Sequence, residues 1–151
     1  MTLETALEAL IQLREGKDIP APRQVLSRVK AEDACRVVPT FRKSIADYVW
    51  HADFWQQIWL ARLAGEPARS MMEDWQSVAP DDWEATRERF LGNLDRAVEV
   101  AQSGEHRIKD DATANRLLLQ IAIHNSYHIG QCVLIKRALR LARVVDRAAQ
   151  R

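Results

Sequence analysis

Several features are scarce in this 151-residue sequence. It has only two cysteines, Cys35 and Cys132, which lie far apart and outside any CxxC pair, so they indicate free thiols in a reducing compartment. Lysine plus arginine number 22 against 21 acidic residues, and the resulting net charge of +1 gives no field that gathers polyanions. We therefore predict no nucleic acid and no membrane among its partners.

Long apolar runs and a secretion signal are also lacking. No segment approaches the roughly 20 consecutive apolar residues that cross a bilayer. Residues 1–12 carry Glu4 and Glu8 and lack the basic start and apolar centre of a signal peptide. These absences predict a cytoplasmic protein.

Apolar residues at helical spacing dominate what is present. The chain is 47% hydrophobic and 28% charged, which is typical of a globular protein, and its length suffices for one hydrophobic core. Apolar side chains recur every three or four positions in four segments, which are residues 2–15, 44–64, 81–104 and 111–145. No segment alternates as a strand does. The pattern predicts an all-α fold, a four-helix bundle in one domain over residues 1–151.

Two predicted helices begin with capping signals. Ser44 followed by Asp47, and Asp81 followed by Glu84, each match the spacing at which a side chain and a backbone N–H satisfy each other. We predict that both pairs cap their helices.

Two long connections separate these helices. Prolines break residues 17–43, although a turn or two of helix is possible within residues 31–38. Residues 66–80 are too broken for a long helix, and a short one near Met71 is possible there. We predict that both segments are mainly connections.

A polar island interrupts the apolar segment 111–145. His124 and His128 lie four residues apart, so their rings project from one helical face at neighbouring turns, where both can bind one ion. A catalytic metal site usually takes three protein ligands and keeps one position open, so a third donor has to come from another helix. His51, which lies among aromatic residues in segment 44–64, is the candidate. The alternative is a pair of histidines satisfied by ordinary hydrogen bonds.

The residues around these histidines resemble a known family. Residues 44–51 read SIADYVWH and residues 124–131 read HNSYHIGQ, and both closely resemble the DinB-like (damage-inducible, YfiT-like) superfamily of metalloproteins. The similarity extends over nearly the whole chain, more loosely in the middle. It implies a four-helix bundle with long crossover connections, commonly a homodimer, that binds one divalent transition metal, zinc or nickel foremost. On this resemblance the metal ligands are His51, His124 and His128.

Two further side chains are candidates to support the ligands. Asp47 lies one turn before His51, so it can accept a hydrogen bond from that ring or cap its own helix. Gln131 shares the stripe of His124 and His128, where it can bond a metal-bound water, the substrate or a neighbouring helix. No carboxylate lies on that stripe, so the sequence identifies no general base and the catalytic residues stay unknown.

Other polar and aromatic residues have simpler interpretations. Asn125 and Tyr127 turn away from the histidine stripe and are predicted to bond between helices. His106 is predicted to be exposed to solvent, and the basic end, residues 136–151, to be a solvated helix end. Most of the five tryptophans are predicted to be core, with some lining a pocket over the metal or a subunit interface.

The resemblance also implies a choice of activities. Some relatives transfer or isomerise with a low-molecular-weight thiol such as bacillithiol, mycothiol or glutathione, and others are proposed hydrolases. Our first hypothesis is a metal-dependent thiol (S-)transferase that acts on small electrophiles, with the thiol as cosubstrate. The alternatives are a metal-dependent hydrolase, which needs no thiol, and a non-catalytic metal-binding stress-response module.

Overall fold

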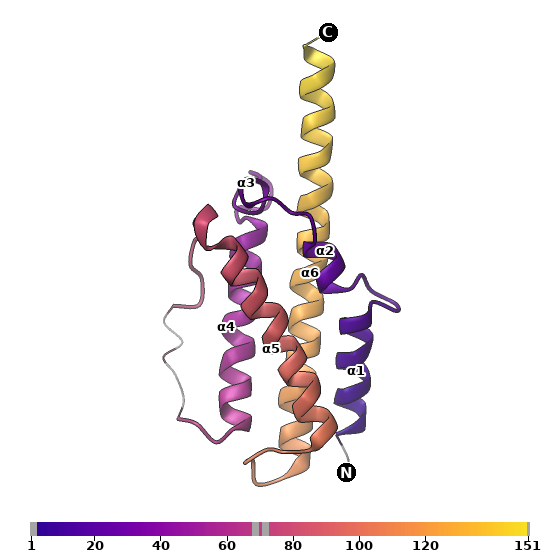
Figure 1. Cartoon of the computed structure of the whole chain (residues 1–151), viewed down its shortest axis with the longest axis vertical. Helices are drawn as coiled ribbons and strands as arrows, with labels where there is room; N and C mark the ends of the chain where they lie inside the picture. Colours follow the sequence, from indigo (N-terminus) through magenta and orange to yellow (C-terminus); the bar gives the residue numbers. More distant parts are fainter. Residues whose placement is uncertain (1–2, 68–69, 71–72, 151) are drawn as a thin grey trace.

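The fold is built from helices alone. The structure is a computed structural model that describes residues 3–67, 70 and 73–150. Over these residues it contains six α-helices and no strand, which confirms the all-α prediction (Figure 1). The α-helices are α1 (Glu4–Glu15), α2 (Pro22–Leu26), α3 (Ala31–Ala34), α4 (Ile45–Leu63), α5 (Trp83–Ser103) and α6 (Asp111–Ala149).

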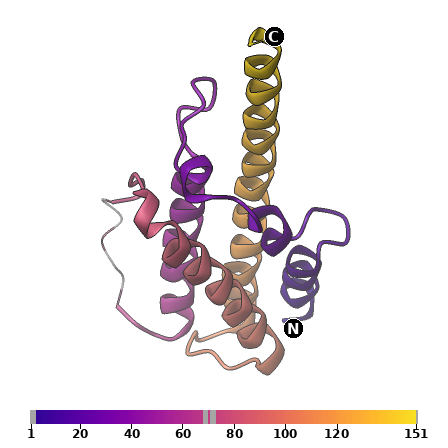
Figure 2. The same cartoon turned by 45° about the horizontal axis from the view of Figure 1, so that its top comes forward.

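The four longer helices, α1, α4, α5 and α6, form the predicted bundle. Helix α6 packs against α4 on one side and α1 on the other, and α5 crosses over α4 and α1 (Figures 1 and 2). The last part of the α4–α5 connection lies beside α4, where Asp74 meets His51 and Val78 meets Asp47, and the connection from α1 to α4 contains α2 and α3. These are the long crossovers that the sequence predicted.

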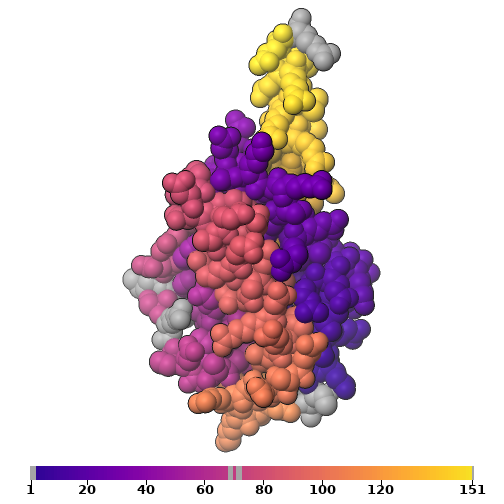
Figure 3. All heavy atoms as spheres, in the orientation of Figure 1, coloured from indigo at the N-terminus to yellow at the C-terminus, as the bar shows by residue number. Residues whose placement is uncertain are grey.

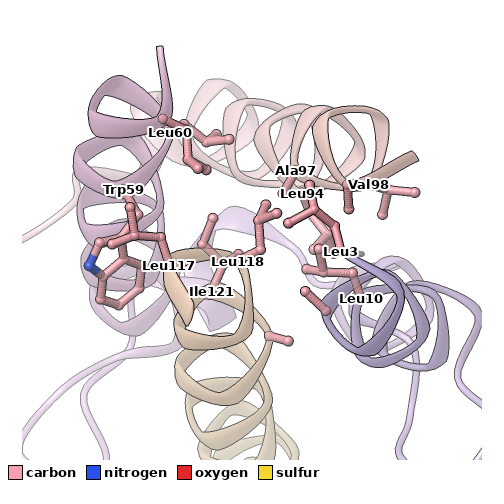
Figure 4. Close-up of a cluster of buried hydrophobic side chains, with 14 of the residues drawn as sticks. Leu3, Leu10, Trp59, Leu60, Leu94, Ala97, Val98, Leu117, Leu118 and Ile121 are labelled. Carbon is pink, nitrogen blue, oxygen red and sulfur yellow. The ribbon is translucent and has the colours of Figure 1, made fainter. Parts of the chain in front are cut away.

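Apolar side chains from each long helix meet in the interior. One of two core clusters fills the end of the bundle where α4 finishes and α6 starts (Figure 4). Its labelled members come from α1, α4, α5 and α6: Leu3, Leu10, Trp59, Leu60, Leu94, Ala97, Val98, Leu117, Leu118 and Ile121. Since burying one such leucine or isoleucine contributes about 1.5–3 kcal/mol, this packing holds the bundle together.

A layer of buried polar side chains lies between the two apolar clusters. The second cluster joins the start of α4 to residues 129–139 of α6. Between the clusters, Asp53, Gln56 and Asn125 are fully buried, and His51 and His128 are each 6% exposed. Asn125 Nδ2 donates to Gln56 Oε1 over 2.6 Å, and Gln56 Nε2 donates to the carbonyl oxygen of Phe90 over 3.0 Å. The middle of the bundle is therefore held by hydrogen bonds across α4, α5 and α6.

One of the two predicted helix caps is present. Ser44 Oγ accepts from the Asp47 N–H over 3.1 Å, and Asp47 Oδ2 accepts from the Ser44 N–H over 3.0 Å. The predicted cap by Asp81 and Glu84 is wrong, because a 3₁₀ turn over Pro80–Asp82 precedes α5 and neither element has a side-chain cap.

A buried tryptophan anchors the start of α5 where the cap was expected. Trp83 is 1% exposed, and its Nε1–H donates to the carbonyl oxygen of Val29 over 3.0 Å. Pro80 opens the preceding 3₁₀ turn, whose first position tolerates a residue that lacks an N–H.

The connections hold slightly more helix than expected. Residues 17–43 contain α2 and α3, and α2 begins with Pro22 in its first turn. Helix α6 continues to Ala149, four residues beyond its predicted end, and its last turns project beyond the bundle (Figure 3). The short helix considered near Met71 lies outside the described residues. Among the described helices, none has the length and hydropathy to span a bilayer.

We expect Ser44→Ala to lower the free energy of unfolding by about 1–2 kcal/mol, because it leaves the first turn of α4 without its cap. Ser77→Ala is the control, since Ser77 is exposed and lies outside the helices. Urea unfolding measures both. Equal midpoints for the two variants would contradict the assignment of this cap.

Candidate metal centre

Three histidines from two helices converge in the middle of the bundle. His51 comes from α4, and His124 and His128 come from α6. One ring nitrogen from each of the three lies within 4.8 Å of the other two, and Nε2 of His128 is 3.1 Å from Nε2 of His124. In the part of the chain that the structure describes, these side chains form the group of histidines close enough to share an ion.

Helix geometry explains this convergence. His124 and His128 are one turn apart on α6, so both rings point toward α4. Because α4 and α6 pack with opposite directions, the start of α4 lies beside the later part of α6, and His51 comes level with the pair. The sequence predicted the pair from its spacing and His51 as the third donor, and the fold brings the three rings together.

A residue from the α4–α5 connection orients the ring of His51. The Nδ1 atom of His51 lies 2.8 Å from both the carbonyl oxygen and Oδ1 of Asp74. Both are acceptors, so Nδ1 carries the proton and Nε2 keeps its lone pair. Asp74 Oδ1 also accepts from Trp55 Nε1 over 2.6 Å, which fixes the carboxylate in turn.

Gln131 orients the ring of His128 in the same way. Its Oε1 lies 2.7 Å from His128 Nδ1, so that nitrogen donates and Nε2 is left free to bind an ion. Histidine ligands in metal sites commonly donate their second N–H to such an acceptor, which sets the tautomer and the ring orientation. Gln131 was predicted to support the metal ligands, and it does contact one of them. Its partner is the ring of His128, and not a metal-bound water or a substrate.

Asp47 was considered as an acceptor for the ring of His51, but its recorded partners lie elsewhere. One of its oxygens caps α4, and the other accepts from the Val78 N–H over 3.1 Å. The capping alternative therefore holds for Asp47, which also ties down the α4–α5 connection. The carboxylate beside His51 is Asp74, which sequence reasoning missed because it lies 23 residues away in an irregular segment.

Aromatic rings enclose the histidines. Trp75 stacks on His51, with ring centroids 3.8 Å apart and planes 7° from parallel. Trp59 and Trp55 meet His124 edge to face, at 5.3 Å and 6.5 Å between centroids. Some tryptophans therefore line the site, as predicted, while Trp83 belongs to the core.

Burial keeps the rings of the α6 pair uncharged. Loss of solvation, with the neighbouring histidines adding to it, lowers the pKa of His124 to about 3. Loss of solvation likewise lowers the pKa of His128 to about 4, despite the hydrogen bond that this ring donates to Gln131. Both rings are therefore neutral near pH 7, and neutral imidazole is the form that binds metal.

The residues present fit a transition-metal ion. Two nitrogens bound to one tetrahedral ion at about 2.0–2.1 Å lie roughly 3.3 Å apart, close to the spacing of the His124 and His128 Nε2 atoms. Lone pairs facing each other at that distance repel unless a proton or a cation lies between them. Three neutral imidazoles suit zinc, nickel, copper and iron alike.

One side of the cluster is open. His51 and His128 are buried, whereas His124 is only half-buried. No fourth histidine, cysteine or carboxylate joins the three in the described residues. The three ligands therefore leave a coordination position that the described residues do not fill, and His124 is the ligand that solvent reaches.

The predictions for Asn125, Tyr127 and His106 have different outcomes. Asn125 bonds across helices to Gln56, as predicted. The same prediction for Tyr127 is wrong, because its side chain points outward on α6, is 64% exposed and meets Gln131 of its own helix. His106 was expected in solvent, but its side chain is 8% exposed and its Nε2 lies 3.2 Å from Asp111 Oδ1.

A helical bundle with three histidines from α4 and α6 is the class of protein that this fold and site define. The family model of the DinB superfamily matches residues 21–132, and the chain belongs to that superfamily. The match includes all three histidines and ends within α6. No curated protein and no solved structure matches the chain.

We expect His124→Ala to abolish binding of a transition metal, because it removes one of three ligands and opens the site to water. His106→Ala is the matched control, since it removes the histidine that lies outside the cluster. Elemental analysis of untagged protein measures the metal content. About one equivalent in the control and none in His124→Ala is the expected result, and equal metal content in both would contradict this ligand set.

We expect Gln131→Ala to weaken metal binding by about 10–100-fold, since His128 loses the acceptor that fixes its tautomer. Gln120→Ala is the control, because Gln120 is an exposed glutamine on the same helix. Competition with a chromophoric chelator measures both affinities. A Gln131 variant as tight as the control would show that the hydrogen bond does not tune the ligand.

Proposed function

We propose that this protein is a metal-dependent thiol (S-)transferase that acts on small electrophiles in the cytoplasm. The observation that carries the proposal is the arrangement of the cluster, in which three imidazoles converge and the side beside His124 stays open. A purely structural metal site is normally closed by a fourth protein ligand. The open side favours an enzyme over a storage or scaffold role.

The side chains of the chain hold the site ready for one divalent ion, zinc or nickel foremost. Asp74 and Gln131 fix the rings of His51 and His128 before the ion arrives, so little ordering is needed on binding. When bound, the ion supplies a positive charge that lowers the pKa of a thiol or a water molecule at the open side.

The chemistry of the walls favours a thiol over a hydroxide nucleophile. In the described residues no carboxylate joins the three histidines, and Asp74 beside them is engaged by His51 and Trp55, so no free base for activating water is identified. A thiol is more acidic than water by several pKa units and needs no such base. Its sulfur would form a bond to the electrophilic carbon, the leaving group would depart with its electron pair, and the thiol proton would go to solvent.

The substrate is expected to be a small and partly apolar molecule. Trp55 and Trp59 meet the half-buried His124, and Tyr127 lies beside His128, so aromatic rings with few hydrogen-bonding groups adjoin the site. A low-molecular-weight thiol as cosubstrate fits the same opening. Such a reaction would remove reactive electrophiles, which is the stress-related role that the transferase hypothesis suggests.

We expect metal-loaded protein to consume thiol in the presence of 1-chloro-2,4-dinitrobenzene, with glutathione and cysteine as the first thiols, and His128→Ala to lose this activity. His106→Ala is expected to keep it. Product absorbance and thiol titration measure the reaction.

Two other outcomes would overturn the transferase. Turnover of p-nitrophenyl acetate without any thiol, lost in His128→Ala, would support the hydrolase instead. A metal-loaded protein inert toward every thiol, electrophile and ester would support the non-catalytic module.

A further inference from the structure

Exposed apolar side chains gather along one face of α6. The large hydrophobic residues that are well exposed in the structure include six on this helix: Ile123, Tyr127, Leu134, Leu141, Val144 and Val145. They range from 48% to 67% exposed. Single exposed apolar residues are ordinary, but a contiguous row of them marks a contact surface.

The spacing of this row is that of a paired helix. Positions 123, 127, 130, 134, 137, 141, 144 and 148 follow one another by alternating steps of four and three, which keeps them on one face over about 38 Å of helix. We call these eight positions the α6 stripe. The opposite face, with Ile135 and Leu139, is buried against the bundle.

Much of the α6 stripe lies beyond the residues that the family model matches. The DinB superfamily match ends at residue 132, whereas α6 continues to Ala149. The end of α6 projects clear of the other helices, and residues 140–150 are all exposed (Figures 1 and 3). None of the three clustered histidines lies on this projecting end.

The stripe complements itself when two copies run in opposite directions. A two-fold axis between residues 135 and 136 places Gly130 opposite the partner's Leu141 and Tyr127 opposite the partner's Val144. A Cβ atom built on Gly130 meets nothing within 4 Å, so the glycine leaves a hole for the leucine. Ile123 then faces the partner's Ala148, so a large residue meets a small one in two of the four pairs along the row.

Charge favours the same direction. In a parallel pair Arg137 would face the partner's Arg137 at the centre of the contact, and like charges placed there repel. In the antiparallel pair Arg137 faces the partner's Leu134, which its aliphatic stem can cover while the guanidinium reaches solvent. The basic ends of the two helices then lie far apart.

A membrane surface fits the stripe less well than a second copy. The helix end is basic and amphipathic, as membrane-surface helices are. However, Lys136 donates to the carbonyl oxygen of Val25, and Arg143 pairs with Asp33 over 2.5 Å, so both bind the chain itself. The stripe also continues to Ile123, which lies beside the core of the bundle rather than on the projecting end.

We propose that two copies of this chain pair through the α6 stripe in antiparallel register. Each copy then covers Tyr127 of the other, whose ring lies 5.1 Å from His128 between centroids. The end of one copy thus forms part of the rim of the other copy's histidine cluster. The pairing itself does not depend on metal binding or on the transferase activity.

We expect the wild-type chain to sediment as a dimer and Leu141→Glu to weaken the dimer by at least about tenfold. Ala142→Glu is the matched control, since it adds the same charge one residue away on an exposed position outside the stripe. Leu141 is 67% exposed, so the substitution leaves the fold intact, and circular dichroism verifies its helix content. A monomeric wild type, or a dimer that Leu141→Glu leaves unchanged, would overturn the proposal. A monomer that cosediments with phosphatidylglycerol vesicles would identify a membrane surface as the occupant instead.

A cross-linking pair tests the direction. In a Cys35→Ser background, Gly130→Cys mixed with Leu141→Cys is expected to form a disulfide between unlike chains, while Gly130→Cys alone is not. The remaining Cys132 is buried and does not interfere. Efficient self-linking of Gly130→Cys would show a parallel pair and overturn the register.

Discussion

The buried hydrogen bonds between Asn125, Gln56 and the carbonyl of Phe90 are the constraint on which the rest of the structure depends. An unsatisfied buried polar group costs about 1–3 kcal/mol, so sliding α6 by one turn along α4 would leave at least two such groups without partners. Apolar packing alone would tolerate that shift far better. The polar layer therefore fixes the level at which α4 and α6 meet, and with it the level of His51 beside His124 and His128.

Asp53 extends this layer toward α5. Its carboxylate is fully buried, and it accepts from Arg89 Nε over 2.7 Å and from Asn93 Nδ2 over 2.8 Å. Removing one partner of a buried charge costs far more than the pair contributes, so the layer acts on specificity more than on stability. Two carboxylates hold the α4–α5 connection in a comparable way, Asp47 through Val78 and Asp74 through His51. The metal centre thus lies between a fixed helix pair and a tethered connection.

The sequence predicted those parts of the molecule that depend on local pattern. Helical periodicity identified the four long helices, and Ser44 with Asp47 marked the start of α4. The spacing of His124 and His128 put two rings on one face, while His51 was the candidate third donor that the family resemblance then supported. The helices, the cap and the histidine pair each follow from neighbours within one or two turns.

What the sequence did not predict depends on contacts between distant segments. Asp74 reaches His51 from an irregular connection whose path no local pattern specifies. The start of α5 is set by Trp83 reaching Val29, and not by the expected cap. Tyr127 points outward because the polar layer fixes the rotation of α6, and His106 is shielded by contacts that no single helix defines.

The most direct test of this account is X-ray absorption at the edge of the bound metal. The account predicts a first shell of nitrogen or oxygen with the outer-shell scattering of three imidazoles. A shell that contains sulfur from cysteine, or one with the scattering of fewer than three imidazoles, would contradict the claim that His51, His124 and His128 together hold the ion.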